Sequence, residues 1–159
     1  MSPHAEIERV WPRDGRIRLV GALHGHTPGG AAESWQLLLV RRDHGDERLR
    51  YDAPLDGARF DASLPVDDLA LDGPPSAVWD LYLSSGPGPG ELRLRAGRHL
   101  DDIRGKKKIM VFPAQSVTTD EYGTVVRPFY TVSDNLSVEC ASGEVPPHYW
   151  EVENPEWVD

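Results

Sequence analysis

Apolar and polar residues alternate along several short windows of this chain, and a period of two is typical of strands that bury one face. Four windows carry inward apolar sets: Ile17, Leu19 and Leu23; Phe60, Ala62 and Leu64; Trp79, Leu81 and Leu83; and Leu92 and Leu94. Residues 34–41 are apolar on both sides, which predicts a central strand. We expect further strands at 108–112, 124–132 and 136–140.

Turn-forming residues separate these windows, with clusters at 26–30, 43–46 and 86–90. Strand and turn follow each other at intervals of about ten residues, which indicates a sandwich of antiparallel strands. Residues 66–70 are the candidate for one short helical turn. We therefore predict an all-β sandwich with at most one or two short helical turns.

The size and composition of the chain fit one core. Its 159 residues are close to the usual size of one domain, and 15 Gly and 14 Pro favour short strands over long helices. We expect a single β-sandwich domain over 1–159, in which 141–159 form a docked or mobile C-terminal tail.

Charge and cysteine content limit the partners and the compartment. The formal net charge is −9, which repels nucleic acid and anionic membranes, so we expect neither as a partner. No apolar stretch approaches the roughly 18 residues that a membrane span needs, and the N-terminus lacks the pattern of a signal peptide. Cys140 stands alone, which fits a reducing environment, and we predict a cytoplasmic protein.

Sequence motifs that carry catalysis are missing. There is no Gly-x-Ser-x-Gly elbow, no P-loop and no Gly-x-Gly-x-x-Gly turn between a strand and a helix. Cys140 lacks a recognisable Cys-His context for a thiol nucleophile. We predict no catalytic residue and no cofactor.

His24 and His26 are the weak candidates for a metal site. They lie two residues apart at the end of a predicted strand, so their side chains would point from one face. A metal needs one or two further ligands, and Arg16 and Arg18 share this face, which favours an exposed surface. We predict no metal, and a small jelly-roll-like enzyme that depends on a metal at these histidines is the alternative hypothesis.

Arg104, Lys106, Lys107 and Lys108 form a positive run in an acidic chain. On one hypothesis, the lysines protect a predicted edge strand at 108–112 from pairing with another molecule. On the other, the run binds phosphate groups of an anionic polymer. The sequence leaves both hypotheses open.

Phe129 and Tyr130 are a second candidate for ligand binding. Adjacent residues on a strand point to opposite faces, so one of the two rings would face outward. An outward ring could stack on a sugar or on a partner protein.

Three segments carry a resemblance to a known group of domains: VWDLYL at 78–83, LRAGR at 94–98 and RPFYTVSDNLSV at 127–138. They resemble the β-rich accessory domains appended to actinobacterial glycosyltransferases and glycerophosphotransferases that build wall polymers. The similarity spans most of residues 16–140. It implies an immunoglobulin-like sandwich and no catalytic residues, because such enzymes carry their chemistry in a separate domain.

The leading hypothesis is therefore a non-catalytic binding or interaction module. It would recognise a carbohydrate or polyol-phosphate polymer, or dock on a glycosyltransferase or polyol-phosphate transferase. An anionic carbohydrate polymer and such an enzyme are the candidate partners. A structural oligomerisation domain is a further alternative, and the sequence leaves the oligomeric state open.

Overall fold

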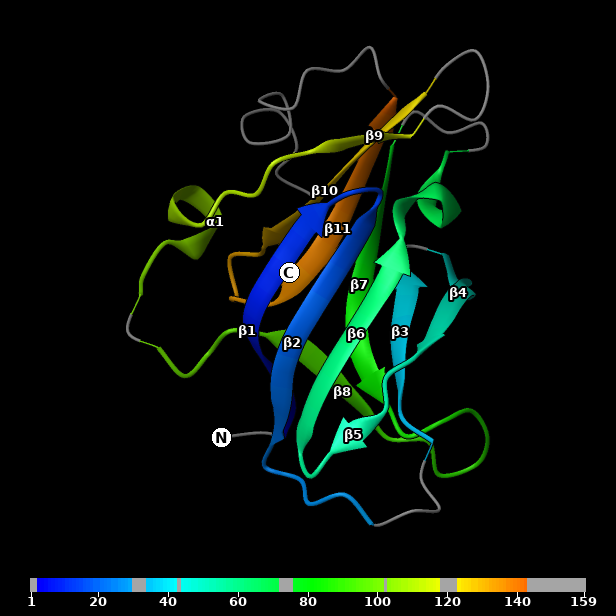
Figure 1. The fold of residues 1–159 in the computed structure, drawn as a ribbon, viewed down its shortest axis with the longest axis vertical. Coiled ribbons are helices and arrows are strands. Elements are labelled where there is room, and N and C mark those ends of the chain that lie inside the picture. The colour runs from blue at the N-terminus through cyan, green and yellow to red at the C-terminus, as the bar shows by residue number, and fades with distance from the viewer. Residues whose placement is uncertain are drawn as a thin grey trace.

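The computed structural model describes residues 3–29, 34–42, 44–71, 76–101, 103–117 and 123–142. This part of the chain is built from strands and two helical turns (Figure 1). In chain order the elements are β1 (His4–Arg13), β2 (Arg16–His24), β3 (Gln36–Arg41), β4 (His44–Asp52), β5 (Leu55–Asp56), β6 (Arg59–Pro65), η1 (Val66–Leu69), β7 (Ser76–Ser84), β8 (Arg93–Gly97), α1 (Lys106–Ile109), β9 (Gln115–Val117), β10 (Thr124–Tyr130) and β11 (Leu136–Ser142). Of the expected tail, residues 141 and 142 belong to β11, and the rest lies outside the described residues.

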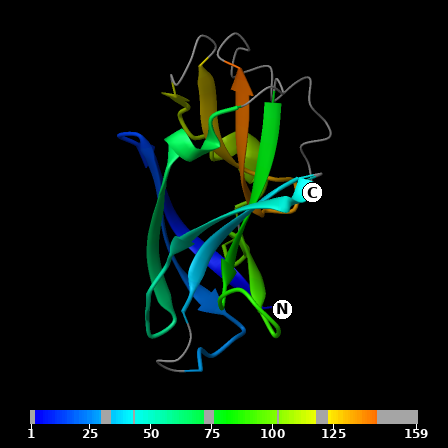
Figure 2. The ribbon, with the colours of Figure 1, turned by 90° about the vertical axis from the view of Figure 1, so that its right-hand side faces the viewer.

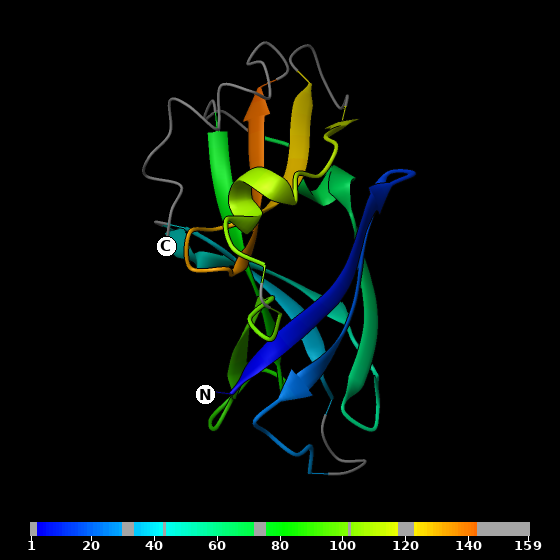
Figure 3. The same cartoon turned by 90° about the vertical axis from the view of Figure 1, so that its left-hand side faces the viewer.

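The strands form two layers that face each other across the core (Figures 2 and 3). One layer has the order β5-β6-β2-β1, and the other has β4-β3-β7-β11-β10-β9. β8 joins the layers, because it pairs antiparallel with β7 and parallel with β1. The predicted all-β sandwich is confirmed, and the β1–β8 pair departs from the expected antiparallel arrangement.

The core lies between the two layers and follows the predicted alternation. Inward leucine and isoleucine side chains of β2, β3, β6 and β7 are fully buried: Ile17, Leu19, Leu37, Leu39, Leu64, Leu81 and Leu83. Each such side chain contributes about 1.5–3 kcal/mol relative to an exposed one. Phe60 and Trp79 also lie in the core, as expected, and so does Trp35, whereas Leu92 is only partly buried.

Two long strands, β1 and β4, have no counterpart among the predicted windows. In β1, a bulge between Ile7 and Arg9 shifts the alternation, so a strict period of two fails across it. β4 is paired with β3 at the border of its layer and packs Leu49 and Tyr51 against the core. A strand with two inward apolar residues among charged ones gives a weak pattern.

The prediction of a strand at 108–112 is wrong. Lys106–Ile109 forms one helical turn, α1, which follows Gly105 at φ +70, in the left-handed region that favours glycine. The 3₁₀ turn η1 lies within the segment where one helical turn was predicted. Neither of these two helical turns in the described part of the chain has the length or the apolar character of a membrane-spanning helix.

One edge of β7 serves two different strands, and we call this feature the β7 fork. Residues 76–80 pair with β11, and residues 82–84 pair with β8. Between them, the Arg95 guanidinium donates hydrogen bonds to the carbonyl oxygens of Leu81 at 3.0 Å and Leu136 at 2.5 Å. A side chain thus satisfies backbone acceptors at the point where the two neighbouring strands diverge.

Asp80 completes the fork. Its carboxylate lies 2.7 Å from Arg42 and 3.2 Å from Arg95, and it accepts a hydrogen bond from the Ser137 hydroxyl at 2.7 Å. Burial acts to raise the pKa of Asp80, but the bond from Arg42, the charge of Arg95 and the Ser137 bond outweigh it and lower the pKa. The carboxylate is therefore ionised at neutral pH and holds both guanidinium groups.

Replacing Arg95 with Met should lower the free energy of unfolding by about 2–4 kcal/mol, because two carbonyl groups lose a donor and Asp80 loses one of its cations. Urea denaturation followed by circular dichroism measures this change. Arg93→Met is the matched control on the same strand and face, and we expect it to cost less than about 1 kcal/mol because the Arg93 side chain is more exposed than that of Arg95 and donates to no backbone carbonyl among the hydrogen bonds of the described residues. Equal losses in the two variants would contradict the role of the fork.

Glu91, just before β8, makes the stability of the fold depend on pH. Burial acts to raise its pKa, but hydrogen bonds from Ser84, Arg50 and Arg93 lower the pKa from 4.5 to about 2. A pKa that is lower in the folded state stabilises the fold above the unfolded value, and this contribution is lost as the pH falls toward the folded value.

We expect Glu91→Gln to be less stable than the wild type at neutral pH and to lose less stability on acidification from about pH 5 to about pH 2. Urea denaturation at several pH values checks both statements. Parallel stability curves for the two proteins across this range would contradict the assignment.

Candidate functional site

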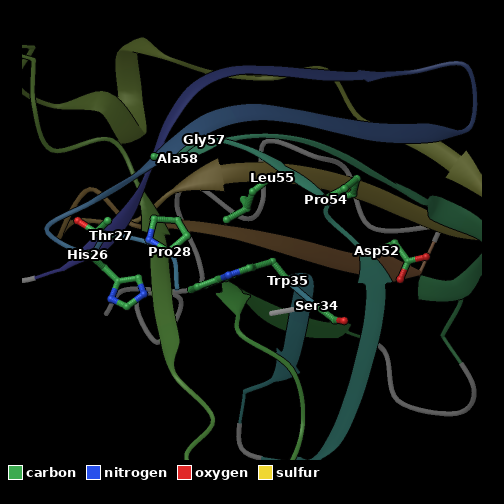
Figure 4. Close-up of a pocket in the computed structure, with 10 residues that line it drawn as sticks. All are labelled: His26, Thr27, Pro28, Ser34, Trp35, Asp52, Pro54, Leu55, Gly57 and Ala58. Carbon is green, nitrogen blue, oxygen red and sulfur yellow. The ribbon is translucent and has the colours of Figure 1, made fainter. Parts of the chain in front are cut away.

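A pocket opens at one end of the sandwich, between the chain that leaves β2, the start of β3 and the β5–β6 hairpin (Figure 4). Its volume is about 850 Å³, which is typical of small-molecule sites. The described residues that line this end pocket are His26, Thr27, Pro28, Ser34, Trp35, Asp52, Pro54, Leu55, Gly57 and Ala58.

Backbone hydrogen bonds hold the segments around the end pocket. The Leu23 amide donates to the Ala58 carbonyl at 2.8 Å, and the Ala53 amide donates to the Trp35 carbonyl at 3.0 Å. Gly57 adopts a φ of +63 in the turn between β5 and β6, a conformation that glycine takes without strain. The pocket is therefore framed by chain segments that are tied to one another.

Trp35 and His26 form the aromatic part of the end pocket. Their ring centroids lie 5.7 Å apart, with the ring planes tilted by 52°. The Nε2 atom of His26 is buried and has no hydrogen-bond partner among the described residues. An unpaired buried polar atom costs about 1–3 kcal/mol, so a ligand that hydrogen-bonds to Nε2 would remove this cost.

The remaining lining combines apolar side chains with a few polar groups. Thr27 and Ser34 offer hydroxyl groups, and Asp52 is the one carboxylate among the described lining residues. Apolar surface with a few placed polar groups is suited to a neutral, hydroxyl-rich ligand such as a sugar or a polyol. A phosphate group would be repelled by the Asp52 carboxylate.

The structure separates His24 and His26, which the sequence analysis paired as metal candidates. β2 ends at His24, and Gly25 at φ +79 turns the chain. The exposed His24 ring lies 5.3 Å from the His4 ring, whereas His26 lies in the end pocket. Across the described ranges, no group of three His, Cys, Asp or Glu side chains could hold a metal ion.

The predicted basic run divides into two kinds of residue. Arg104 and Lys108 are exposed and Lys107 is partly buried, but Lys106 is only 2% exposed. The Lys106 ammonium lies 2.8 Å from Asp101, donates to the Ile103 carbonyl at 2.8 Å and lies 3.6 Å from Asp134. Lys106 is therefore occupied inside the fold, while phosphate binding by the other three stays a prediction.

Phe129 and Tyr130 are both buried, at 5% and 1% exposure, so neither supplies the outward ring that was expected. Tyr130 belongs to the main core and lies 5.8 Å from the Phe112 ring. Phe129 packs with Val78 and Ala141 in a second small cluster. Both faces of β10 are buried at this point, which a rule based on alternation alone does not foresee.

Cys140 is a buried core residue of β11. Burial raises the pKa of its thiol, and the nearby Glu139 carboxylate adds to the shift. The thiol therefore stays protonated at neutral pH, which is the opposite of what a thiol nucleophile requires.

The sequence analysis missed the end pocket because three separate chain segments form it. Trp35 belongs to the segment predicted as a central strand and lies in the core, but it also lines the pocket. Residues 26–30 were assigned to a turn cluster, and residues 52–58 carried no prediction. A tryptophan only five residues after the turn cluster at 26–30 is the signal that could have pointed to this site.

Comparisons with known proteins give a likeness in fold. No family model matches the chain, and no curated protein matches it. A crystal structure of S. aureus TarS matches with a TM-score of 0.66 and 12% identity over 92% of this chain and 25% of that one. A crystal structure of S. aureus TarS residues 217–571 matches with a TM-score of 0.67 and 14% identity over 89% of this chain and 39% of that one.

The chain thus spans a quarter of the length of the first TarS structure and about two-fifths of the second. Its fold is similar to one part of TarS. At this level of identity, the likeness concerns the arrangement of strands.

Replacing Lys106 with Ser should lower the free energy of unfolding by about 3 kcal/mol, because Asp101 and the Ile103 carbonyl lose a buried partner. Lys108→Ser, at an exposed position of the same helical turn, should change it by less than about 0.5 kcal/mol. Thermal and urea denaturation of both variants checks the difference. Equal stabilities would show that the Lys106 contacts contribute nothing to the fold.

Proposed function

We propose that this chain is an accessory domain of a glycosyltransferase-type enzyme and that it binds a carbohydrate ligand without catalysing a reaction on it. Two observations support the accessory role. Three sequence segments resemble accessory domains of wall-polymer enzymes, and the fold is similar to one part of TarS, a wall teichoic acid glycosyltransferase. An immunoglobulin-like topology and a cytoplasmic location belong to the same proposal.

The unpartnered Nε2 atom of His26 carries the proposal of a ligand. His26 lines the end pocket beside Trp35, with hydroxyl groups of Thr27 and Ser34 also in the lining. A sugar or polyol offers both an apolar face for the rings and hydroxyl groups that donate to or accept from an imidazole nitrogen. One uncharged sugar or polyol unit of a carbohydrate polymer would occupy this pocket.

Binding rather than chemistry is the function that the lining residues support. General acid and base catalysis needs two titratable groups in distinct environments that face one reacting bond. Among the described lining residues, His26 and Asp52 are the titratable ones, and neither hydrogen-bonds to the other in the structure. The arrangement provides a polar anchor within an apolar pocket.

Replacing His26 with Ala should weaken the binding of uncharged pyranoses and linear polyols roughly three- to tenfold, the value of one lost hydrogen bond. Ligand-observed NMR titration with a panel of such compounds measures the affinities. His24→Ala is the matched control, two residues earlier and outside the pocket, and it should bind as the wild type does. Unchanged affinity in His26→Ala, or no binding of any panel member to the wild type, would overturn the proposal.

A further inference from the structure

The outward side of β1, β2 and β6 gathers arginines around a tryptophan, and we call it the arginine face. Its exposed arginines and the partly buried tryptophan are Arg9, Trp11, Arg13, Arg16, Arg18 and Arg59. In the register of these strands, Trp11 lies opposite Arg18, and Arg13 lies opposite Arg16. The end pocket shares none of these residues.

The charge of this face is opposite to that of the whole protein. Three of its five arginines pair with one carboxylate each, those of Glu8, Asp14 and Asp61. Five positive charges against three negative ones leave +2, so the remainder of a chain of net charge −9 carries −11. An anionic partner is therefore attracted to this face, whereas the net charge of the remaining residues repels it.

Two of the arginines each form a bidentate contact with one carboxylate. Arg18 donates to both oxygens of Asp61, at 2.9 and 2.6 Å, and Arg59 donates to both oxygens of Glu8, at 2.9 and 2.8 Å. These hydrogen bonds lower the pKa of Glu8 and Asp61, so both acids stay ionised. The positive charge that remains for a partner belongs to the other three arginines.

Arg13 and Arg16 are the most available of these. They face each other across the β1–β2 hairpin, and like charges directly opposite on a sheet destabilise it. The Arg16 guanidinium donates to the Ser63 hydroxyl at 2.9 and 3.1 Å, a neutral acceptor, and it forms no ion pair with any described residue. Arg13 lies 3.9 Å from Asp14, with three quarters of its side chain exposed. An anion between the two would remove the repulsion.

The turn that joins Arg13 and Arg16 is anchored to the fold. The Gly15 amide donates to the Gln115 side chain at 2.8 Å, and the Gln115 amide group donates to the Arg16 carbonyl at 2.8 Å. The Val66 amide donates to the Gly15 carbonyl at 3.0 Å. The two arginines are therefore presented from a fixed backbone, which lowers the entropy cost of binding.

Trp11 extends the site along the strands. The Arg18 guanidinium carbon lies 4.8 Å from its ring centroid and that of Arg9 lies 6.0 Å away. A guanidinium over an indole can bind an anion through its N–H edge. Asp61 occupies this edge in Arg18, so Arg9 is the one of the two that offers it to a ligand among the described residues. Alternate residues on a strand are about 6.6 Å apart. The arginines of this face are therefore spread over a distance that one small anion cannot span.

We propose that the arginine face binds successive phosphate groups of a flexible phosphodiester-linked polyol chain. The inference rests on the proposed function for the polyol part of the partner, and on the arginine row for the phosphate part. A flexible chain can follow the row while it avoids the acidic remainder of the surface, which a wide nucleic-acid duplex or a membrane would meet.

The test measures the affinity of a glycerol-phosphate oligomer of about ten units for two double variants. Arg13→Ser with Arg16→Ser should lose at least tenfold in affinity at low salt, and the slope of log affinity against log salt should shrink by roughly 0.7 for each lost phosphate contact. Arg48→Ser with Arg93→Ser makes the same change in charge at exposed positions of β4 and β8, and it should lose less than threefold. Circular dichroism confirms that both variants fold.

Several results would overturn this inference. Equal losses of affinity in the two double variants would show that only the net charge of the protein matters. A larger loss of affinity in Lys107→Ser with Lys108→Ser would show that the phosphate groups bind at α1. Equally tight, Arg13- and Arg16-dependent binding of single-stranded DNA or of anionic vesicles would show that the partner is assigned wrongly. Uncharged polyols separate the two proposals, because their binding depends on the end pocket and should be unchanged in the Arg13 and Arg16 variant.

Discussion

The two layers of this sandwich depend on how β7 divides one edge between β11 and β8. If β11 paired with the whole of β7, β8 would have no place in that layer and could not reach β1. The divergence leaves backbone carbonyls without ladder partners, and the Arg95 guanidinium satisfies two of them. Asp80 lies between Arg42 and Arg95, and its carboxylate balances the positive charge that Arg95 brings into the sheet.

The fork has a consequence for function, because it fixes one layer relative to the other. β8 leaves β7 and runs beside β1, so the outward face of β1, β2 and β6 keeps a defined position on the core. The β5–β6 hairpin, which lines the end pocket, and the β1–β2 turn lie at opposite ends of the sandwich (Figures 1 to 3). A neutral binding pocket and a positive face on one rigid body suit a long ligand that presents hydroxyl and phosphate groups in turn.

The sequence predicted those strands in which apolar and polar residues alternate without interruption. The strands with clean alternation, such as those around Leu19 and Leu81, were placed correctly, and the all-β sandwich followed from them. The strand β1 was missed because its bulge breaks the period of two. The burial of Lys106 was missed because its partners include the distant Asp134 as well as the nearby Asp101. Such a contact between residues far apart in sequence leaves no local pattern.

The candidate sites show the same limit. The exposed face that carries Arg16 and Arg18 was predicted from alternation, but Trp11 and Arg9 join it only once the bulge in β1 is known. The end pocket needs three segments to meet, and the Nε2 atom of His26 becomes informative only when its surroundings are seen. Phe129 and Tyr130 mark the opposite error, since alternation predicts one exposed ring and the fold buries both.

The central claim is that this domain binds a hydroxyl- and phosphate-bearing chain through the end pocket and the arginine face. Backbone amide NMR, recorded during titration with a glycerol-phosphate oligomer, tests it most directly because every described segment reports at once. The account predicts shift changes that saturate together at residues 26–29, 34–35 and 52–58 and at residues 9–18. Changes confined to α1 and its flanking loop, or no saturable change at any segment, would contradict it.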